Sequence, residues 1–85
     1  MAIEIIMPQI GQDIETGRIV EWLKNEQDPV EQGEIICTVE ADKGIFEVEA
    51  EASGILLKII CRAGEDAKVL KPIGYIGKAG ETIES

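Results

Sequence analysis

The best candidate for chemistry in this chain is the tetrapeptide Ala41-Asp42-Lys43-Gly44, near the middle of the sequence. It lies between two strand-like runs, residues 35–40 and 45–49, which are rich in β-branched residues or alternate apolar with acidic ones. Aspartate favours the start of a tight turn and glycine favours its end. We therefore expect a β-hairpin that presents Lys43 in water at its tip.

A lysine at such a tip is either a solvated surface charge or an attachment point for another group. A free lysine amine is protonated at neutral pH and is a poor nucleophile by itself. If Lys43 carries chemistry, another enzyme must therefore acylate its amine.

Most other kinds of site are excluded or unsupported. The chain has no histidine, which rules out Ser-His-Asp and Cys-His catalysis and zinc sites built from His and Cys within it. Cys37 and Cys61 lie in apolar runs and are expected to be buried thiols. Trp22 is expected in the core. The alternating glutamates Glu47, Glu49 and Glu51 are expected on one solvated face, and Gly74, Gly77 and Gly80 do not form a phosphate-binding loop.

Length and charge limit the choice further. A chain of 85 residues is one small domain with a thin core. A net charge of −9 argues against nucleic acid and anionic membranes as partners, and favours partners with basic patches. No signal peptide and no run long enough to cross a membrane is visible. We expect a soluble, intracellular and monomeric domain.

The pattern along the chain predicts an all-β fold. Short β-rich runs separated by turn residues, and the near absence of helical periodicity, indicate a sandwich or barrel. The chain also repeats itself weakly, as two halves of about four strands that meet at Asp42-Lys43 and bury a core between two sheets. The first half has a longer loop, at residues 9–16, and the chain ends should lie together, far from the hairpin tip. The expected strands are residues 3–7, 18–23, 29–30, 34–40, 45–50, 55–61, 68–69 and 72–76.

Residues 40–44, followed by Phe46-Glu47-Val48, resemble the attachment motif of lipoyl domains, the carrier modules of 2-oxo acid dehydrogenase complexes. The resemblance extends over residues 3–80. It includes Ile6-Met7-Pro8, Gly17, Trp22-Leu23, Asp28-Pro29-Val30, Gly33 and Ile35 in the first half, and Gly54, Ile59, Gly64, Asp66, Pro72-Ile73 and Ile76-Gly77 in the second.

This resemblance implies a flattened β-barrel or sandwich of two four-stranded antiparallel sheets with quasi-twofold symmetry. It implies that lipoic acid is attached to Lys43 through an amide, and that Asp42 and Gly44 form the turn that presents it. The implied partners are a thiamin-dependent 2-oxo acid decarboxylase, a dihydrolipoyl dehydrogenase, and a lipoate ligase or lipoyl transferase. Residues 9–16 are a candidate contact with the decarboxylase, because family members place this loop beside the modified turn.

The resemblance also sets expectations for the whole protein. Residues 1–79 would be a non-catalytic carrier domain of an acyltransferase (E2) subunit, and residues 80–85 the start of a flexible linker. The protein would act in the bacterial cytoplasm or the mitochondrial matrix.

Two alternatives stay open. One is a biotin carrier domain of a carboxylase or decarboxylase, although methionines flank the lysine of biotinyl domains and Asp42 and Gly44 stand there here. The other is an unmodified structural domain of the same architecture. Ala41, where lipoyl domains often have threonine, and Glu49, where many have proline, depart from the family pattern and weaken assignment to one substrate complex.

Overall fold

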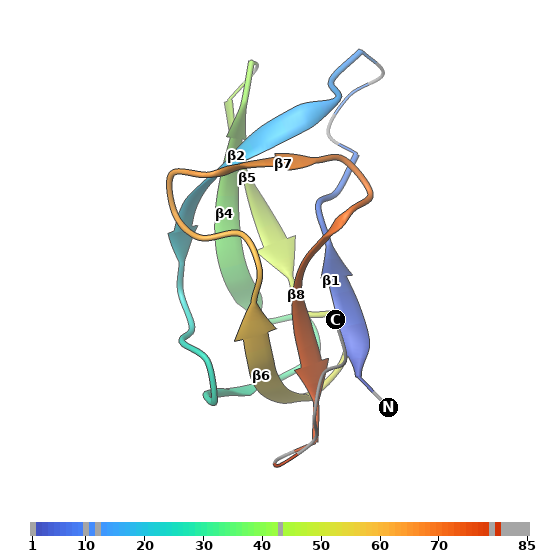
Figure 1. Ribbon diagram of the computed structural model, residues 1–85, viewed down its shortest axis with the longest axis vertical. Helices are drawn as coiled ribbons and strands as arrows, with labels where there is room; N and C mark the ends of the chain where they lie inside the picture. The colour runs from blue at the N-terminus through green and yellow to red at the C-terminus, as the bar shows by residue number, and fades with distance from the viewer. Residues whose placement is uncertain (1, 10, 12, 43, 79, 81–85) are drawn as a thin grey trace.

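The computed structural model describes residues 2–9, 11, 13–42, 44–78 and 80. Its secondary structure consists of strands, and none of the described residues forms a helix, so none offers a helix that could cross a membrane. Figure 1 shows the strands, which are β1 (Ile3–Ile6), β2 (Thr16–Trp22), β3 (Pro29–Val30), β4 (Ile35–Ala41), β5 (Gly44–Glu49), β6 (Gly54–Ile59), β7 (Asp66–Lys68) and β8 (Pro72–Gly77).

The strands form two four-stranded antiparallel sheets. One sheet has the order β1-β8-β6-β3, and the other has the order β5-β4-β2-β7. Strands β1 to β4 correspond to strands β5 to β8. Exchanging each strand for its counterpart converts the first order into the second. The predicted all-β sandwich of two four-stranded sheets with quasi-twofold symmetry is therefore confirmed.

Hydrogen bonds between loops and strands repeat in the same way. The Ile19 amide donates to the Glu65 carbonyl at 2.8 Å, and the Leu56 amide donates to the Asp28 carbonyl at 2.9 Å. Leu56 follows Ile19 by 37 positions, and Glu65 follows Asp28 by the same interval. The two halves thus share their backbone bonding although few of their residues are identical.

The first strands of the two halves, β1 and β5, are related by a different interval of sequence positions. Ile3 of β1 pairs with Ile76 of β8, and Phe46 of β5 pairs with Val39 of β4. Phe46 follows Ile3 by 43 positions, whereas Ile76 follows Val39 by 37. The first half therefore has six more residues between its first two strands, which confirms the longer loop predicted there.

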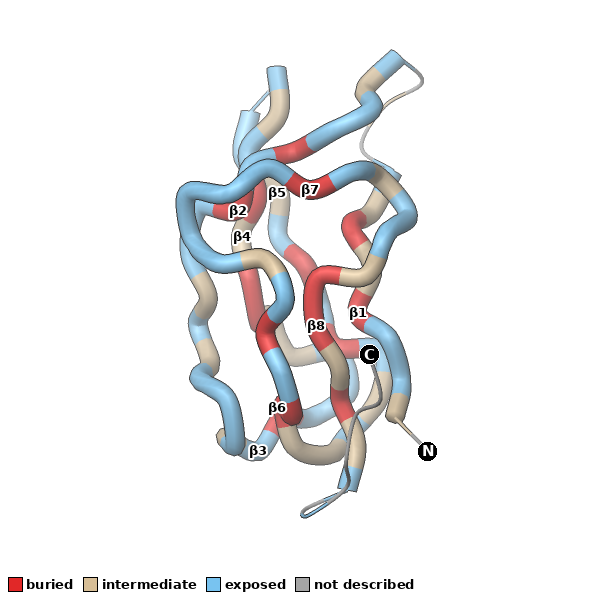
Figure 2. Tube along the Cα trace, viewed as in Figure 1, coloured by how far each residue is buried: buried red, intermediate tan, exposed pale blue. Residues whose placement is uncertain are grey.

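Residues from both sheets form the core. Figure 2 shows buried positions along strands of both sheets. The half-buried Trp22 packs against the core and donates from Nε1 to the Cys61 carbonyl at 2.7 Å, so its predicted core role is confirmed. Cys37 is fully buried, but Cys61 is only partly buried, contrary to expectation, because it follows β6 in the turn towards β7. The largest fully buried side chains are Met7, Ile19, Ile36, Leu56, Ile73, Ile76, Val39 and Cys37.

Apart from β3, every predicted strand differs from the observed one by one or two residues at one end or both, and β2 begins at Thr16 rather than at position 18. β6 ends at Ile59 rather than at position 61, because the chain turns there. The strand predicted at residues 68–69 is β7, Asp66–Lys68, which forms because it pairs with the start of β2. Glu47, Glu49 and Glu51 are exposed, as predicted.

The first and last strands are neighbours, since Ile3 pairs with Ile76. Figure 1 shows this pair of strand ends at the opposite end of the molecule from the β4–β5 turn. The predicted separation between the chain ends and the hairpin tip is therefore confirmed for the strands that begin and end the fold.

Candidate functional site

The predicted hairpin is formed by β4 and β5, whose pairing runs from Ile35↔Glu49 up to Ala41↔Gly44. Because Ala41 pairs with Gly44, two sequence positions, 42 and 43, separate the paired residues of the two strands. Asp42 is exposed and lies in the turn, as predicted. Lys43 is outside the described residues, so its predicted role as attachment point stays a prediction.

Gly44 has a backbone requirement rather than a packing one. Its φ is +140°, in a region that L side chains rarely adopt, and a Cβ built there would meet no heavy atom within 4 Å. The space around this corner of the hairpin is open. A side chain that began at this corner would therefore meet no described residue within 4 Å of its Cβ, apart from its chain neighbours.

The lower part of the hairpin is anchored in the core. Val39 of β4 is fully buried and Val48 of β5 is nearly so, and β4 is hydrogen-bonded on both sides, to β5 and to β2. Gly17 of β2 is buried beside the hairpin, where an added Cβ would lie 3.3 Å from Met7 Sδ and 3.5 Å from the Glu40 carbonyl oxygen. The tip therefore projects from a stiff support.

The surface near the tip is acidic with one exposed apolar residue. Glu40 and Asp42 are both exposed, and Ile45 is 62% exposed. Arg18 pairs with Glu40 across β2 and β4, and its Nε lies 3.3 Å from Asp66 Oδ1. Neither Ile45 nor Arg18 was predicted from the sequence as part of the site. Arg18 gives no local signal, because only the strand register brings it beside the turn.

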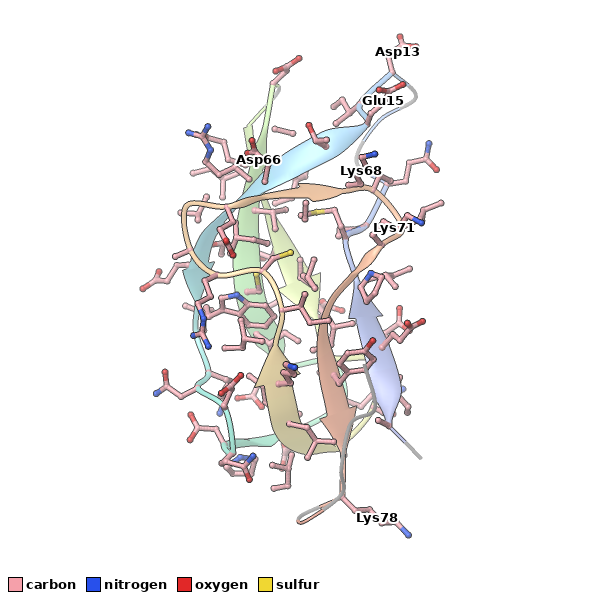
Figure 3. All side chains as sticks on the ribbon, viewed as in Figure 1. Asp13, Glu15, Asp66, Lys68, Lys71 and Lys78 are labelled. Carbon is pink, nitrogen blue, oxygen red and sulfur yellow. The ribbon has the colours of Figure 1, made fainter. Side chains whose placement is uncertain are left out.

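The β1–β2 connection reaches the same end of the molecule. It leads into β2, whose Arg18 pairs with Glu40 only two positions before Asp42. Figure 3 shows Asp13 and Glu15 of this connection at that end. Positions 10 and 12 of the predicted contact segment lie outside the described residues, and its contact with a decarboxylase stays a prediction.

The two thiols are not suited to nucleophilic chemistry. Burial raises the pKa of Cys37 to about 12. Burial, and to a smaller extent the Glu65 carboxylate, raises the pKa of Cys61. Since the thiolate is the reactive form, both cysteines are expected to be unreactive at neutral pH. The described residues also contain no group of three or more potential metal ligands.

Comparison with known proteins shows the family to which this chain belongs. The family model described as "Biotin-requiring enzyme" (Biotin_lipoyl) matches residues 3–76. The chain is 42% identical over 89 residues to the pyruvate dehydrogenase E1 component subunit beta of Rhizobium meliloti, covering 100% of this chain and 19% of that protein. It is 36% identical over 84 residues to the dihydrolipoyllysine-residue acetyltransferase component of the acetoin cleaving system of Bacillus subtilis, covering 99% and 21%.

Solved structures that share the fold include a lipoyl domain and a carboxylase. One is the lipoyl domain of the 2-oxoglutarate dehydrogenase complex from Azotobacter vinelandii, with a TM-score of 0.74, 29% identity, and coverage of 92% of this chain and 99% of that one. The other is the urea carboxylase of Kluyveromyces lactis, with a TM-score of 0.76, 25% identity, and coverage of 91% and 6%.

The chain spans only about a fifth of the length of these curated relatives. Several further relatives are named as dihydrolipoyllysine-residue acyltransferase components, and the Azotobacter lipoyl domain is matched over nearly its whole length. These matches favour the lipoyl over the biotinyl branch. The chain therefore belongs to the Biotin_lipoyl family and has the fold of its lipoyl domains.

Proposed function

We propose that this chain is the lipoyl carrier domain of a 2-oxo acid dehydrogenase acyltransferase subunit, and that lipoic acid is joined to Lys43 by an amide. The observation that carries the proposal is a hairpin closed by Ala41↔Gly44 in a lipoyl-type fold, because Asp42 and Lys43 are the two residues of the sequence between that pair. The relatives named as acetyltransferase and succinyltransferase components support the placement in an acyltransferase.

The described residues around the turn fit such a group. Asp42 and Gly44 are exposed, and the space beside Gly44 is open. A modifying ligase must reach the amine, and a carried group must enter the active sites of other proteins. Both needs are met by a turn that projects from the fold, and neither would be met by a residue in a cleft.

The chain itself supplies position and recognition. When bound, lipoic acid supplies a dithiolane that accepts an acyl group and a pair of electrons. Asp42 and Gly44 hold the attachment point at the tip, and the stiff β4–β5 stem keeps it away from the core. The tether raises the local concentration of the carried group at successive active sites, so the domain needs no catalytic residues of its own.

The proposed partners follow from this role. They are a thiamin-dependent 2-oxo acid decarboxylase, a dihydrolipoyl dehydrogenase, and the lipoate ligase or lipoyl transferase that loads the domain. We place the protein in the bacterial cytoplasm or the mitochondrial matrix. Residues 1–79 would form the carrier domain and residues 80–85 would begin a linker, most of which lies outside the described residues.

The test is the intact mass of the chain after incubation with lipoate, ATP and a lipoate ligase. We expect a gain of one lipoyl group, abolished in Lys43→Arg and retained in the matched control Lys58→Arg, which changes an exposed lysine of β6. An unchanged mass, or loss of the gain in the control alone, would refute the proposal. A gain of biotin with a biotin ligase, detected by streptavidin, would support the biotin-carrier alternative instead.

One comparison favours a second candidate, in which the same carrier domain is part of a decarboxylase subunit rather than of an acyltransferase subunit. The Rhizobium relative, 42% identical, is named as an E1 component subunit beta rather than as an acyltransferase. The carrier function would be the same, but the domain would be fused to the decarboxylase. Activity assays on the full-length protein separate the two placements, since acyl transfer to coenzyme A indicates the first and thiamin-dependent decarboxylation the second.

A further inference from the structure

A groove with a volume of about 720 Å³ lies between β1 and β5, away from the hairpin turn. These two strands are the outermost members of their sheets, at the ends of the orders β1-β8-β6-β3 and β5-β4-β2-β7. Each therefore presents an edge that pairs with no strand among the described residues. Edges of this kind are templates for an added strand.

The groove has buried apolar residues at its base and exposed acidic residues along and just after β5. Ile5, Val48, Ala50 and Ile76 are buried apolar residues that line it. Glu47, Glu49 and Glu51 also line it, together with Glu4, and all four are exposed. Among its described lining residues there is no lysine or arginine.

The quasi-twofold relation shows that this charge belongs to β5 rather than to both edges. The interval of 43 positions that relates β1 to β5 makes an uncharged residue the equivalent of two of the three glutamates in and just after β5. The equivalent pairs are Glu4 with Glu47, Ile6 with Glu49, and Pro8 with Glu51.

Leu70 adds an apolar contact at the rim of the groove. It is 58% exposed and has a φ of 69°, a conformation that is unfavourable for a leucine. The equivalent residue in the other half is Gly33, which lines the same groove and meets the backbone requirement without strain. A bulky apolar side chain is thus held in water at a position where glycine would suffice.

We propose that the β1/β5 groove binds an extended segment of a partner protein, with alternating basic and apolar residues, as an additional strand along β5. Its basic side chains would face Glu47 and Glu49 on the outer side of the sheet. Its apolar side chains would point inward over Val48, and Leu70 would cover one end. Opposite charges across neighbouring strands stabilise pairing, whereas like charges oppose it. A second copy of β5 is therefore excluded as the occupant by its own glutamates.

The probe is a capped hexapeptide of alternating lysine and valine, titrated into the isotope-labelled 85-residue chain and followed by amide chemical shifts. We expect the largest shifts along β5 and at Leu70. We expect Glu47→Gln/Glu49→Gln to weaken binding about tenfold, since two charge pairs are lost. The matched control Glu21→Gln/Glu31→Gln removes two exposed charges outside the groove and should change binding little.

Main-chain pairing is tested by N-methylation of the peptide. In a strand, alternate amides face one neighbour. One set of amides, either those of the lysines or those of the valines, should face β5, and methylating that set should abolish binding. Methylating the other set should leave binding unchanged. Equal effects of both sets, equal binding of a scrambled peptide, equal weakening by the control variant, or no shifts at millimolar peptide would each overturn the proposal. So would dimerisation of the free chain through β5.

Two further variants separate this surface from other roles. Leu70→Asn should bind the peptide more weakly yet unfold at the same or a higher urea concentration, because asparagine tolerates a positive φ better than leucine but offers no apolar contact. Equal peptide binding by this variant would count against Leu70 as a contact. Lys43→Arg should bind the peptide as the wild type does, so failure of the groove proposal and failure of the carrier proposal are distinguishable.

Discussion

Gly33 and Leu70 occupy equivalent positions in the two halves of the fold, and both have a positive φ, of 88° and 69°. The Gly33 amide donates to the Ala50 carbonyl, and the Leu70 amide donates to the Met7 carbonyl, each at 2.8 Å. The conformation is therefore imposed by the strand arrangement and not by the residue that happens to be present.

A second pair, Gln27 and Gly64, confirms this pattern, with φ values of 78° and 90°. A side chain is tolerated in one half of each pair, so the fold survives a Cβ there at some energetic cost. We predict that Gly33→Ala and Gly64→Ala each lower the free energy of unfolding by about 1 kcal/mol. Neither Cβ would meet an atom within 4 Å, so strain alone would cause the loss. Urea denaturation measures it, and wild-type stability in both variants would show that these turns adapt freely.

A different pair of equivalent glycines differs in packing. A Cβ at Gly54 would lie 2.7 Å from the Gly77 carbonyl oxygen, which is backbone, whereas a Cβ at Gly17 would first meet Met7 Sδ at 3.3 Å. A methionine side chain can move aside and a sheet backbone cannot. We predict that Gly54→Ala lowers the free energy of unfolding by at least about 2 kcal/mol, and more than Gly17→Ala does. The order of the two urea midpoints checks this, and the reverse order would contradict it.

Most of the fold could be predicted from local sequence, because side-chain alternation specifies which face of a strand is buried. The run from Ile45 to Glu49 is an example, since its apolar residue Val48 is buried between two exposed glutamates. β7 was harder to place, because Asp66 is an ordinary turn residue that becomes a strand residue only by pairing with Arg18. That pairing joins residues 48 positions apart and leaves no local signal.

The candidate site likewise has features that local sequence indicates and features that only the folded structure shows. The turn at Asp42 is local chemistry and was predictable, whereas Gly44, which was expected in the turn, is the first residue of β5 and pairs with Ala41. Ile45 was not among the predicted site residues, although strand alternation places it on the same exposed face as Glu47 and Glu49, with Phe46 and Val48 facing inward. The β1/β5 groove was not predictable, since it depends on how the two sheets lie against each other.

The buried thiol of Cys37 makes stability depend on alkaline pH. Burial raises its pKa from an ordinary 9.0 to about 12. Between these values the unfolded chain releases the thiol proton while the folded chain keeps it, so the free energy of unfolding falls as pH rises. We predict that this fall between pH 9 and pH 11 is smaller in Cys37→Ala than in the wild type.

Urea denaturation at several pH values measures that slope for both proteins. Cys37→Ala will be less stable throughout because it leaves a cavity, so the comparison rests on slopes rather than on absolute stability. Cys61→Ala is the control. Cys61 is only partly buried, so this variant should keep most of the wild-type slope. Identical slopes for Cys37→Ala and the wild type would show that the thiol titrates normally.

The position of the lysine in the turn should determine how fast it is lipoylated. Ala41↔Gly44 closes the hairpin, so a lysine at position 42 leaves the turn in a different direction, and one at position 44 must adopt a φ of +140°. We predict that Asp42→Lys/Lys43→Asp and Lys43→Gly/Gly44→Lys, which keep the net charge, are lipoylated at least about tenfold more slowly than the wild type. Rates come from intact mass over time with a fixed amount of ligase. Thermal denaturation must first show that both variants are folded, because the second places a side chain in a strained conformation. If folded variants were loaded at the wild-type rate, the ligase would recognise any exposed amine on this hairpin, and the turn geometry would have no part in selecting Lys43.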